Sequence, residues 1–234
     1  MKKSILSIGL LLAVSFAVVS FTSCSSRKPN VIRAENILGS TRFVESVRII
    51  REIEPTSTGR RIQLLAIAPL ENNGFRLNLP LILPDKWLFP LDEFIEEAEG
   101  ITISDKDARV YMLFRELSGW DNYGRIYGDF RLRVDDDRFW IETMWIYADR
   151  NVSITGEING EFNEEYSLNL KRGWNRAYII NDSVNETHLM TTQRPADANF
   201  QWRFLFRSGS DGRLVLPDEI ESKSLRSIKS LLAR

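Results

Sequence analysis

Residues 139–147, FWIETMWIY, decide the fold that this sequence predicts. Apolar side chains occupy both of the alternating faces of this segment: Phe139, Ile141, Trp145 and Tyr147 on one, and Trp140, Met144 and Ile146 on the other. A strand with one face in water carries polar residues at every second position instead. We therefore expect a strand that lies deep in the structure and is covered on both sides.

Period-two alternation continues through much of the chain, interrupted by Gly, Asn and Asp clusters. The segments that show it are 75–79 (after the turn 72–74), 126–134, 151–158, 166–170, 174–180 and 200–206. We expect 166–170 and 174–180 to form a hairpin at Gly173, because glycine takes a positive φ cheaply. The pattern predicts an all-β fold of about ten to twelve strands in antiparallel sheets, arranged as a β-sandwich or a barrel.

Helix is expected in only two places. Residues 90–99 begin with Pro90, carry acidic residues in the first turn and are followed by Gly100. Residues 217–234 form a possible C-terminal helix, with acidic residues early and basic residues late, as the helix dipole favours.

The start of the chain has the pattern of an export signal. Lys2 and Lys3 precede the uncharged apolar segment 5–19, which is too short to span a membrane, and residues 20–23 lead into Cys24. Cys24 is the only cysteine in the chain. The pattern resembles a lipoprotein signal, which is cut before a cysteine that then receives acyl chains such as palmitate. We expect residues 1–24 to be the signal segment, with Cys24 as the lipid attachment site, and residues 25–31 to be a polar tether. An ordinary secretory signal cut near Ser23 is the alternative.

The predicted mature chain has a composition that limits its partners. Removal of residues 1–24 from the 234 leaves 210, with 29 basic and 32 acidic residues and a net charge of −3. This charge gives no general attraction to nucleic acid, so we expect no nucleic-acid partner. In the lipoproteins that the start of the chain resembles, surface-exported members often carry acidic residues just after the cysteine, and no acidic residue follows Cys24 here. The resemblance therefore implies the periplasmic side of the outer membrane in the cell envelope. Because acylation of Cys24 would leave no free cysteine, we expect no disulfide within the chain. The fold then depends on a packed aromatic and aliphatic core.

Two domain organisations fit the pattern. One has an N-terminal β unit at 32–100 and a larger β unit at 105–210, divided at the polar turn near residues 100–107. The other is a single continuous domain, 32–210, with the short helix as a cap.

Three segments together resemble a known group of proteins. They are NNGFRLNLP at 72–80, YADRNVSITG at 147–156 and LNLKRGWN at 168–175. The arrangement resembles uncharacterised Bacteroidota lipoproteins with β-rich periplasmic or surface domains. The resemblance implies a location and a fold class, and it implies no activity.

The sequence gives little support for catalysis. His188 is the only histidine, it lies in a polar segment that predicts an exposed loop, and no nucleophile-elbow motif accompanies it. We expect no metal site and no cofactor, because clusters of His and Cys ligands are absent. Adjacent carboxylates do not identify a glycosidase, since the distance between two catalytic carboxyls depends on the fold. They occur at Glu96–Glu97, 135–137 and Glu164–Glu165.

The best candidate for ligand binding is the segment SGWDNYG at 118–124. Trp120 and Tyr123 offer aromatic faces for a sugar ring or a peptide, and Asp121 and Asn122 offer hydrogen-bonding groups beside them. The alternative is that the two aromatic rings fold back and fill the end of a sheet.

We therefore expect a lipid-anchored envelope protein that is a non-catalytic binding or assembly module, with the membrane and either another envelope protein or a glycan as partners. A glycan hydrolase and a lipocalin-like carrier of an apolar ligand are the alternatives.

Overall fold

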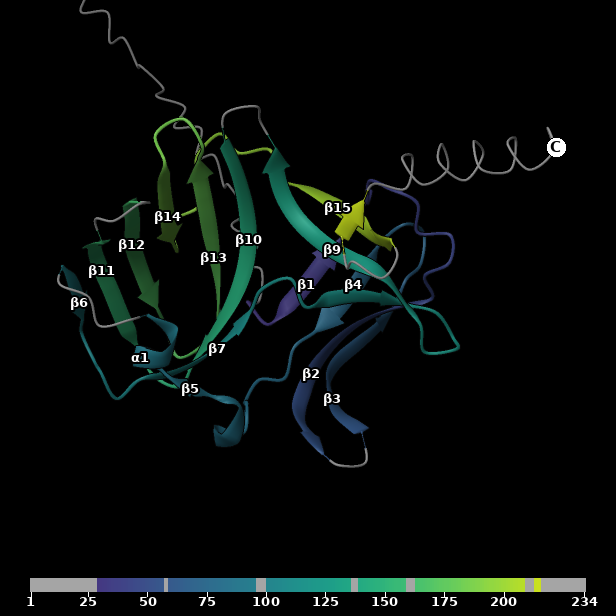
Figure 1. Ribbon diagram of the computed structural model, residues 1–234, viewed down its shortest axis with the longest axis horizontal. Coiled ribbons are helices and arrows are strands. Elements are labelled where there is room, and N and C mark those ends of the chain that lie inside the picture. The colour runs from purple at the N-terminus through teal and green to yellow at the C-terminus, as the bar shows by residue number, and fades with distance from the viewer. Residues whose placement is uncertain are drawn as a thin grey trace, which may run out of the picture.

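The computed structural model describes residues 29–56, 59–95, 100–135, 139–158, 163–208 and 213–215 (Figure 1). Within these ranges the chain is built almost entirely of strands, which confirms the predicted all-β class. The helical elements described are a 3-10 helix, η1 (Asp85–Trp87), and a single helical turn, α1 (Leu91–Phe94). The strands are β1 Val31–Ala34, β2 Ser46–Thr56, β3 Gly59–Pro69, β4 Phe75–Asn78, β5 Phe89–Pro90, β6 Ile101–Ile103, β7 Arg109–Leu113, β8 Leu117–Trp120, β9 Ile126–Asp135, β10 Phe139–Ala148, β11 Val152–Ile158, β12 Asn163–Leu170, β13 Gly173–Asp182, β14 Thr187–Thr191, β15 Gln201–Ser208 and β16 Arg213–Val215.

The strands form one large mixed sheet and one small antiparallel sheet, a sandwich-like arrangement. The large sheet runs in the order β3-β2-β8-β9-β10-β13-β14-β12-β11-β6, with β15 and β16 attached at β9 and with β7 and β5 attached at β10. Strands β1 and β4 form the small sheet. In Figure 1, β9 crosses from the group around β10 and β13 to the group around β15, β1 and β4.

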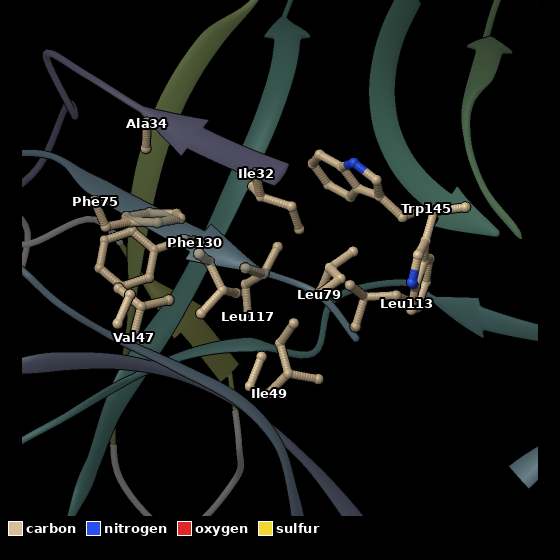
Figure 2. Close-up of a cluster of buried hydrophobic side chains, with 14 of the residues drawn as sticks. Ile32, Ala34, Val47, Ile49, Phe75, Leu79, Leu113, Leu117, Phe130 and Trp145 are labelled. Carbon is tan, nitrogen blue, oxygen red and sulfur yellow. The ribbon is translucent and has the colours of Figure 1, made fainter. Parts of the chain in front are cut away.

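Strand β10 is buried on both faces, as its two apolar faces predict. Trp145 and Tyr147 on one face pack in a first core cluster with residues of β1, β2, β4, β7, β9, β13 and β15 (Figure 2). Met144, Ile146 and Ala148 on the other face pack in a second cluster with residues of α1, β7, β11, β12 and β13. The prediction is therefore confirmed, because each face of the strand belongs to a different core.

Strands β9 and β10 pair over a short distance and then separate. They pair only from Arg133 to Asp135 and from Trp140 to Glu142. Beyond this point β10 pairs with β7, and β9 pairs with β8. A fork therefore opens between β9 and β10, and the consecutive strands β7 and β8 fill it.

The predicted hairpin at Gly173 is wrong, although Gly173 does take the expected positive φ, of 96°. Strands β12 and β13 do not pair, because β14 lies between them, parallel to β12 and antiparallel to β13. The Asn175 side chain fixes the connection instead, by donating to the carbonyl oxygens of Lys171 (2.7 Å) and Gly173 (2.9 Å). The β12–β14 pair is also the one parallel pair within the described sheets.

The helix predicted at 90–99 is described as the single turn α1, preceded by Pro90. Leu91 and Ile95 are buried in the second core cluster, so this turn covers one face of the large sheet. Residues 96–99, the signal segment 1–24 and the possible C-terminal helix 217–234 lie outside the described residues.

The two predicted β units share contacts. The first core cluster contains residues from 32–88 as well as residues from 111–204, and β2 pairs with β8. Val31, which the sequence assigned to the tether, is the first residue of β1.

Candidate functional site

The predicted binding segment lies where β8 turns back into β9. Trp120, at the end of β8, is buried, and the Arg48 guanidinium lies 5.0 Å from the centre of its ring. Asn122 and Tyr123 are exposed, and 85% of Tyr123 is accessible to solvent. The structure therefore does not present Trp120 and Tyr123 together as a pair of accessible aromatic faces.

Asp121 is buried and organises this turn. Its carboxylate accepts hydrogen bonds from the backbone N–H groups of Tyr123 and Arg125, both at 2.8 Å, and from Arg125 Nε at 2.7 Å. Burial alone would raise the pKa of Asp121, but these hydrogen bonds outweigh it and hold the pKa below its usual value. Since its oxygens are already occupied, the arrangement explains a local turn more directly than contact with a ligand. Ligand binding by residues 120–123 stays a prediction.

A cavity of about 420 Å³ lies elsewhere, between the small sheet and the large one. Its lining comes from β1 and the segment after it, from β9, β10, β13 and β15, and from the segment before β15. The lining residues are Arg33, Glu35, Asn36, Leu132, Thr143, Arg176, Tyr178, Arg194, Phe200 and Trp202.

The aromatic wall of this cavity is held rigidly. Trp202 is buried, it stacks on Trp145 with ring centroids 6.2 Å apart, and its Nε1 donates to the carbonyl oxygen of Arg33 at 2.9 Å. Tyr178 is also buried and packs against Phe200, with centroids 5.3 Å apart. These contacts hold the rings in place; Trp202 and Tyr178 are almost fully buried, and the half-buried Phe200 is the most accessible aromatic ring of the lining.

The charged wall of the cavity is positive. Arg33, Arg176 and Arg194 line it, whereas Glu35 is the single carboxylate among the described lining residues. Arg176 lies 5.6 Å from the Trp145 ring centre and Arg194 lies 5.6 Å from that of Phe200. Within the described part of the chain, none of the three arginines forms an ion pair. Guanidinium groups in this situation are suited to binding a carboxylate or a phosphate.

Thr143 contributes a polar group to the lining of the cavity. The residue is buried in β10, and its Oγ1 has no hydrogen-bond partner among the described residues. A buried hydroxyl without a partner is uncommon in proteins. A polar ligand or a water molecule in the cavity would give this hydroxyl a partner.

A second hollow, of about 410 Å³, lies at the turn between β13 and β14 and is lined by Glu164, Asn181, Asp182, Ser183, Glu186, Thr187 and His188. The predicted exposed loop at His188 is wrong, because His188 lies in β14 and is half-buried beside Trp140. Glu164 accepts a hydrogen bond from the Tyr166 hydroxyl at 2.7 Å. Nowhere in the described ranges do three His, Cys, Asp or Glu side chains come together as metal ligands.

A charged network with two buried carboxylates, Glu142 and Asp129, lies at the fork between β9 and β10. Glu142 lies 3.6 Å from Arg131 Nε and 3.3 Å from Arg115 Nη2. Asp129 accepts hydrogen bonds from Ser118 Oγ at 3.0 Å and from Arg207 Nη2 at 3.2 Å. Burial raises the pKa of Asp129 and lowers that of Arg131. Arg131 Nε has no hydrogen-bond partner among the described residues, so its ion pair with Glu142 is what compensates its buried charge.

The arginine-lined cavity was not predicted from the sequence, because its residues lie far apart along the chain. One signal was available in the segment 139–147, where Thr143 and Glu142 interrupt two otherwise apolar faces. A polar residue in a strand that is buried on both sides needs a partner, and the cavity and the fork are the places where these two residues lie.

No described helix has the length and the apolar character needed to cross a bilayer. No protein-family model, curated protein or solved structure matches the chain, so its function has to be inferred from the geometry of the cavity.

Proposed function

We propose that this protein is a lipid-anchored, non-catalytic binding protein of the cell envelope, and that its arginine-lined cavity binds an acidic saccharide. The single observation that carries the proposal is the combination of three guanidinium groups without ion pairs and a rigid aromatic wall in one cavity. A uronic acid has both of the matching features, namely a carboxylate and a ring with apolar C–H faces. Arginine recognises the carboxylate, and aromatic rings cover the faces of the sugar.

The same lining supports binding rather than glycoside hydrolysis. Hydrolysis of a glycosidic bond ordinarily uses two carboxyl groups on opposite sides of that bond. Glu35 is the one carboxylate that the described lining contains, and three cations surround the cavity with it. The positive lining also disfavours the predicted alternative of an apolar ligand, because the arginines would lose hydration without gaining a partner.

The anchor is proposed from the start of the chain. Cys24 follows a short apolar leader and is the only cysteine. Acylation there would place the domain at a membrane, on the periplasmic side of the outer membrane in the organisation that the sequence favours. Mass spectrometry of the native protein tests this part, with a diacylated or triacylated Cys24 as the expected result and an uncleaved leader as the contradicting one.

Isothermal titration of the folded domain tests the ligand. We expect it to bind an oligosaccharide of uronic acids and not a neutral oligosaccharide of the same length. Inorganic phosphate is the third ligand to be titrated. Phosphate binding without uronate binding would contradict the proposed saccharide and indicate a phosphorylated ligand.

The variant Arg176→Gln removes one charge from the cavity wall. We expect it to weaken uronate binding by about tenfold or more, since a hydrogen bond to a charged group contributes roughly 1.5–3 kcal/mol. Arg172→Gln is the matched control, because Arg172 is exposed and lies outside the cavity lining. Equal affinity of both variants for uronate would refute the assignment of the cavity.

A further inference from the structure

Two aliphatic side chains stand out from the described surface. Leu81 is 74% exposed and Ile82 is 77% exposed, and they are adjacent in the segment between β4 and η1. A single exposed leucine is ordinary, whereas two neighbouring aliphatic residues at this exposure form a small protruding apolar patch.

The backbone beneath these side chains is fixed. Leu79 and Leu83, on either side, are buried in the first core cluster, and Pro80 and Pro84 restrict the backbone between them. The Trp174 Nε1 donates to the carbonyl oxygen of Pro80 at 2.7 Å. Because this base is held in place, Leu81 and Ile82 cannot turn inward without disrupting the core.

The protruding patch lies beside the point where the chain leaves the domain towards Cys24. The backbone N–H of Leu79 donates to the carbonyl oxygen of Asn30 at 2.8 Å, and Asn78 pairs with Val31 across β1 and β4. Asn30 lies six positions after Cys24 in the chain. A chain of six residues extends at most about 20 Å, so an acyl anchor on Cys24 would keep Asn30 within about that distance of the bilayer. The protruding patch follows Leu79, the hydrogen-bond partner of Asn30, by two and three residues.

The charges around this end of the domain suit an anionic surface. Lys171 and Arg172 are exposed in the turn just before Trp174, whose indole contacts Pro80. The nearby carboxylate of Asp85 is paired with Arg109 at 3.2 Å. The predicted tether adds Arg27 and Lys28. Basic residues close to a membrane surface are attracted to anionic lipid headgroups.

We propose that Leu81 and Ile82 insert into the boundary between the headgroups and the acyl chains of the membrane that holds Cys24. The insertion would fix this end of the domain against the bilayer. The inference rests on the proposed acylation of Cys24 and adds an orientation to it. Insertion of exposed aliphatic side chains beside a lipid anchor strengthens membrane attachment through the apolar area that leaves water.

The test uses the full lipoprotein, reconstituted in vesicles of phosphatidylethanolamine and phosphatidylglycerol. In the variant Ile82→Cys the introduced cysteine is the only free thiol, since acylation blocks Cys24, and it takes an environment-sensitive fluorophore. The matched control is Val184→Cys. Val184 is another exposed aliphatic residue, at 64%, in the turn that follows the far end of β13 from Trp174. Quenching by lipids that carry a shallow nitroxide is then compared between the two labelled proteins.

We expect the label at residue 82 to be quenched at least several-fold more strongly than the label at residue 184. Acylated protein with equal quenching at both sites, or with none at residue 82, overturns the insertion and leaves the proposed anchor standing. Mass spectrometry that finds Cys24 unmodified overturns the anchor and this inference with it. The two failures are therefore distinguishable.

Discussion

Replacement of Glu142 with Gln tests whether the charged network in the fork between β9 and β10 stabilises the fold. Glu142 has 2% of its side chain exposed, and Arg131, at 3.6 Å, has 11% exposed. Without the carboxylate charge, Arg131 keeps no ion pair among the described residues. Leaving one partner of a buried pair uncompensated costs about 3–5 kcal/mol. The contact with Arg115 adds little, because that side chain is 43% exposed and its charge is screened by solvent.

We therefore expect Glu142→Gln to lower the free energy of unfolding by about 3 kcal/mol, which corresponds to a melting temperature lower by roughly 6–12 °C for a chain of this size. The assay is equilibrium unfolding in urea of residues 25–234, which contain no cysteine. Glu165→Gln is the matched control, because Glu165 is exposed on β12, and it should change the free energy by less than about 0.5 kcal/mol.

A double variant measures the interaction energy between Glu142 and Arg131 apart from the contacts that each side chain makes with its other neighbours. Glu142→Leu combined with Arg131→Met removes both charges and leaves side chains of similar volume, so it should be less destabilised than the sum of the two single variants. A loss below about 1 kcal/mol for Glu142→Gln, or strict additivity of the single variants, would refute the reasoning.

Two further predictions concern pH and packing. The carboxylate of Glu116 accepts a hydrogen bond from the Tyr111 hydroxyl at 2.7 Å. Burial raises the pKa of Glu116, so the folded state holds the proton of this carboxyl group more tightly than the unfolded state does. Its contribution to stability is fully present below the usual carboxyl pKa of 4.5 and is lost as the pH rises through the raised value. Between pH 4 and pH 7, the free energy of unfolding should decline less with rising pH in Glu116→Gln than in the unchanged protein. Identical slopes for the two proteins would contradict this. Gly128→Ala should cost about 3 kcal/mol or more, because a methyl group there would collide with the carbonyl oxygen of Leu205 on the neighbouring strand, and a melting temperature unchanged by the variant would count against the packing described.

The sequence predicted the elements whose environment depends on local pattern. The two apolar faces of β10 predicted its burial, and the alternation of Phe75, Leu77 and Leu79 predicted an inward face that the structure confirms. These predictions succeeded because the period of a strand fixes which side chains share a face.

The predictions that failed depend on contacts between distant segments. The hairpin at Gly173 and the exposed loop at His188 failed for one reason, namely that β14 lies between β12 and β13. Local pattern carries no information about which strand becomes the neighbour of another. The arginine-lined cavity was missed in the same way, because Arg33, Arg176 and Trp202 meet only once the two sheets have packed together.

The hydrogen bond from Trp202 to Arg33 joins residues that are 169 positions apart. Leu38 reinforces this closure, since it exchanges backbone hydrogen bonds with Trp202 and Phe204. A segment near the start of the domain is therefore held by hydrogen bonds to a segment near its end. The first core cluster cannot be completed until nearly the whole chain has been synthesised. Contacts this distant in sequence form slowly, because a long loop must close before they stabilise anything. A nascent chain of this kind stays unfolded for longer, which is the state that the export proposed for this protein would require.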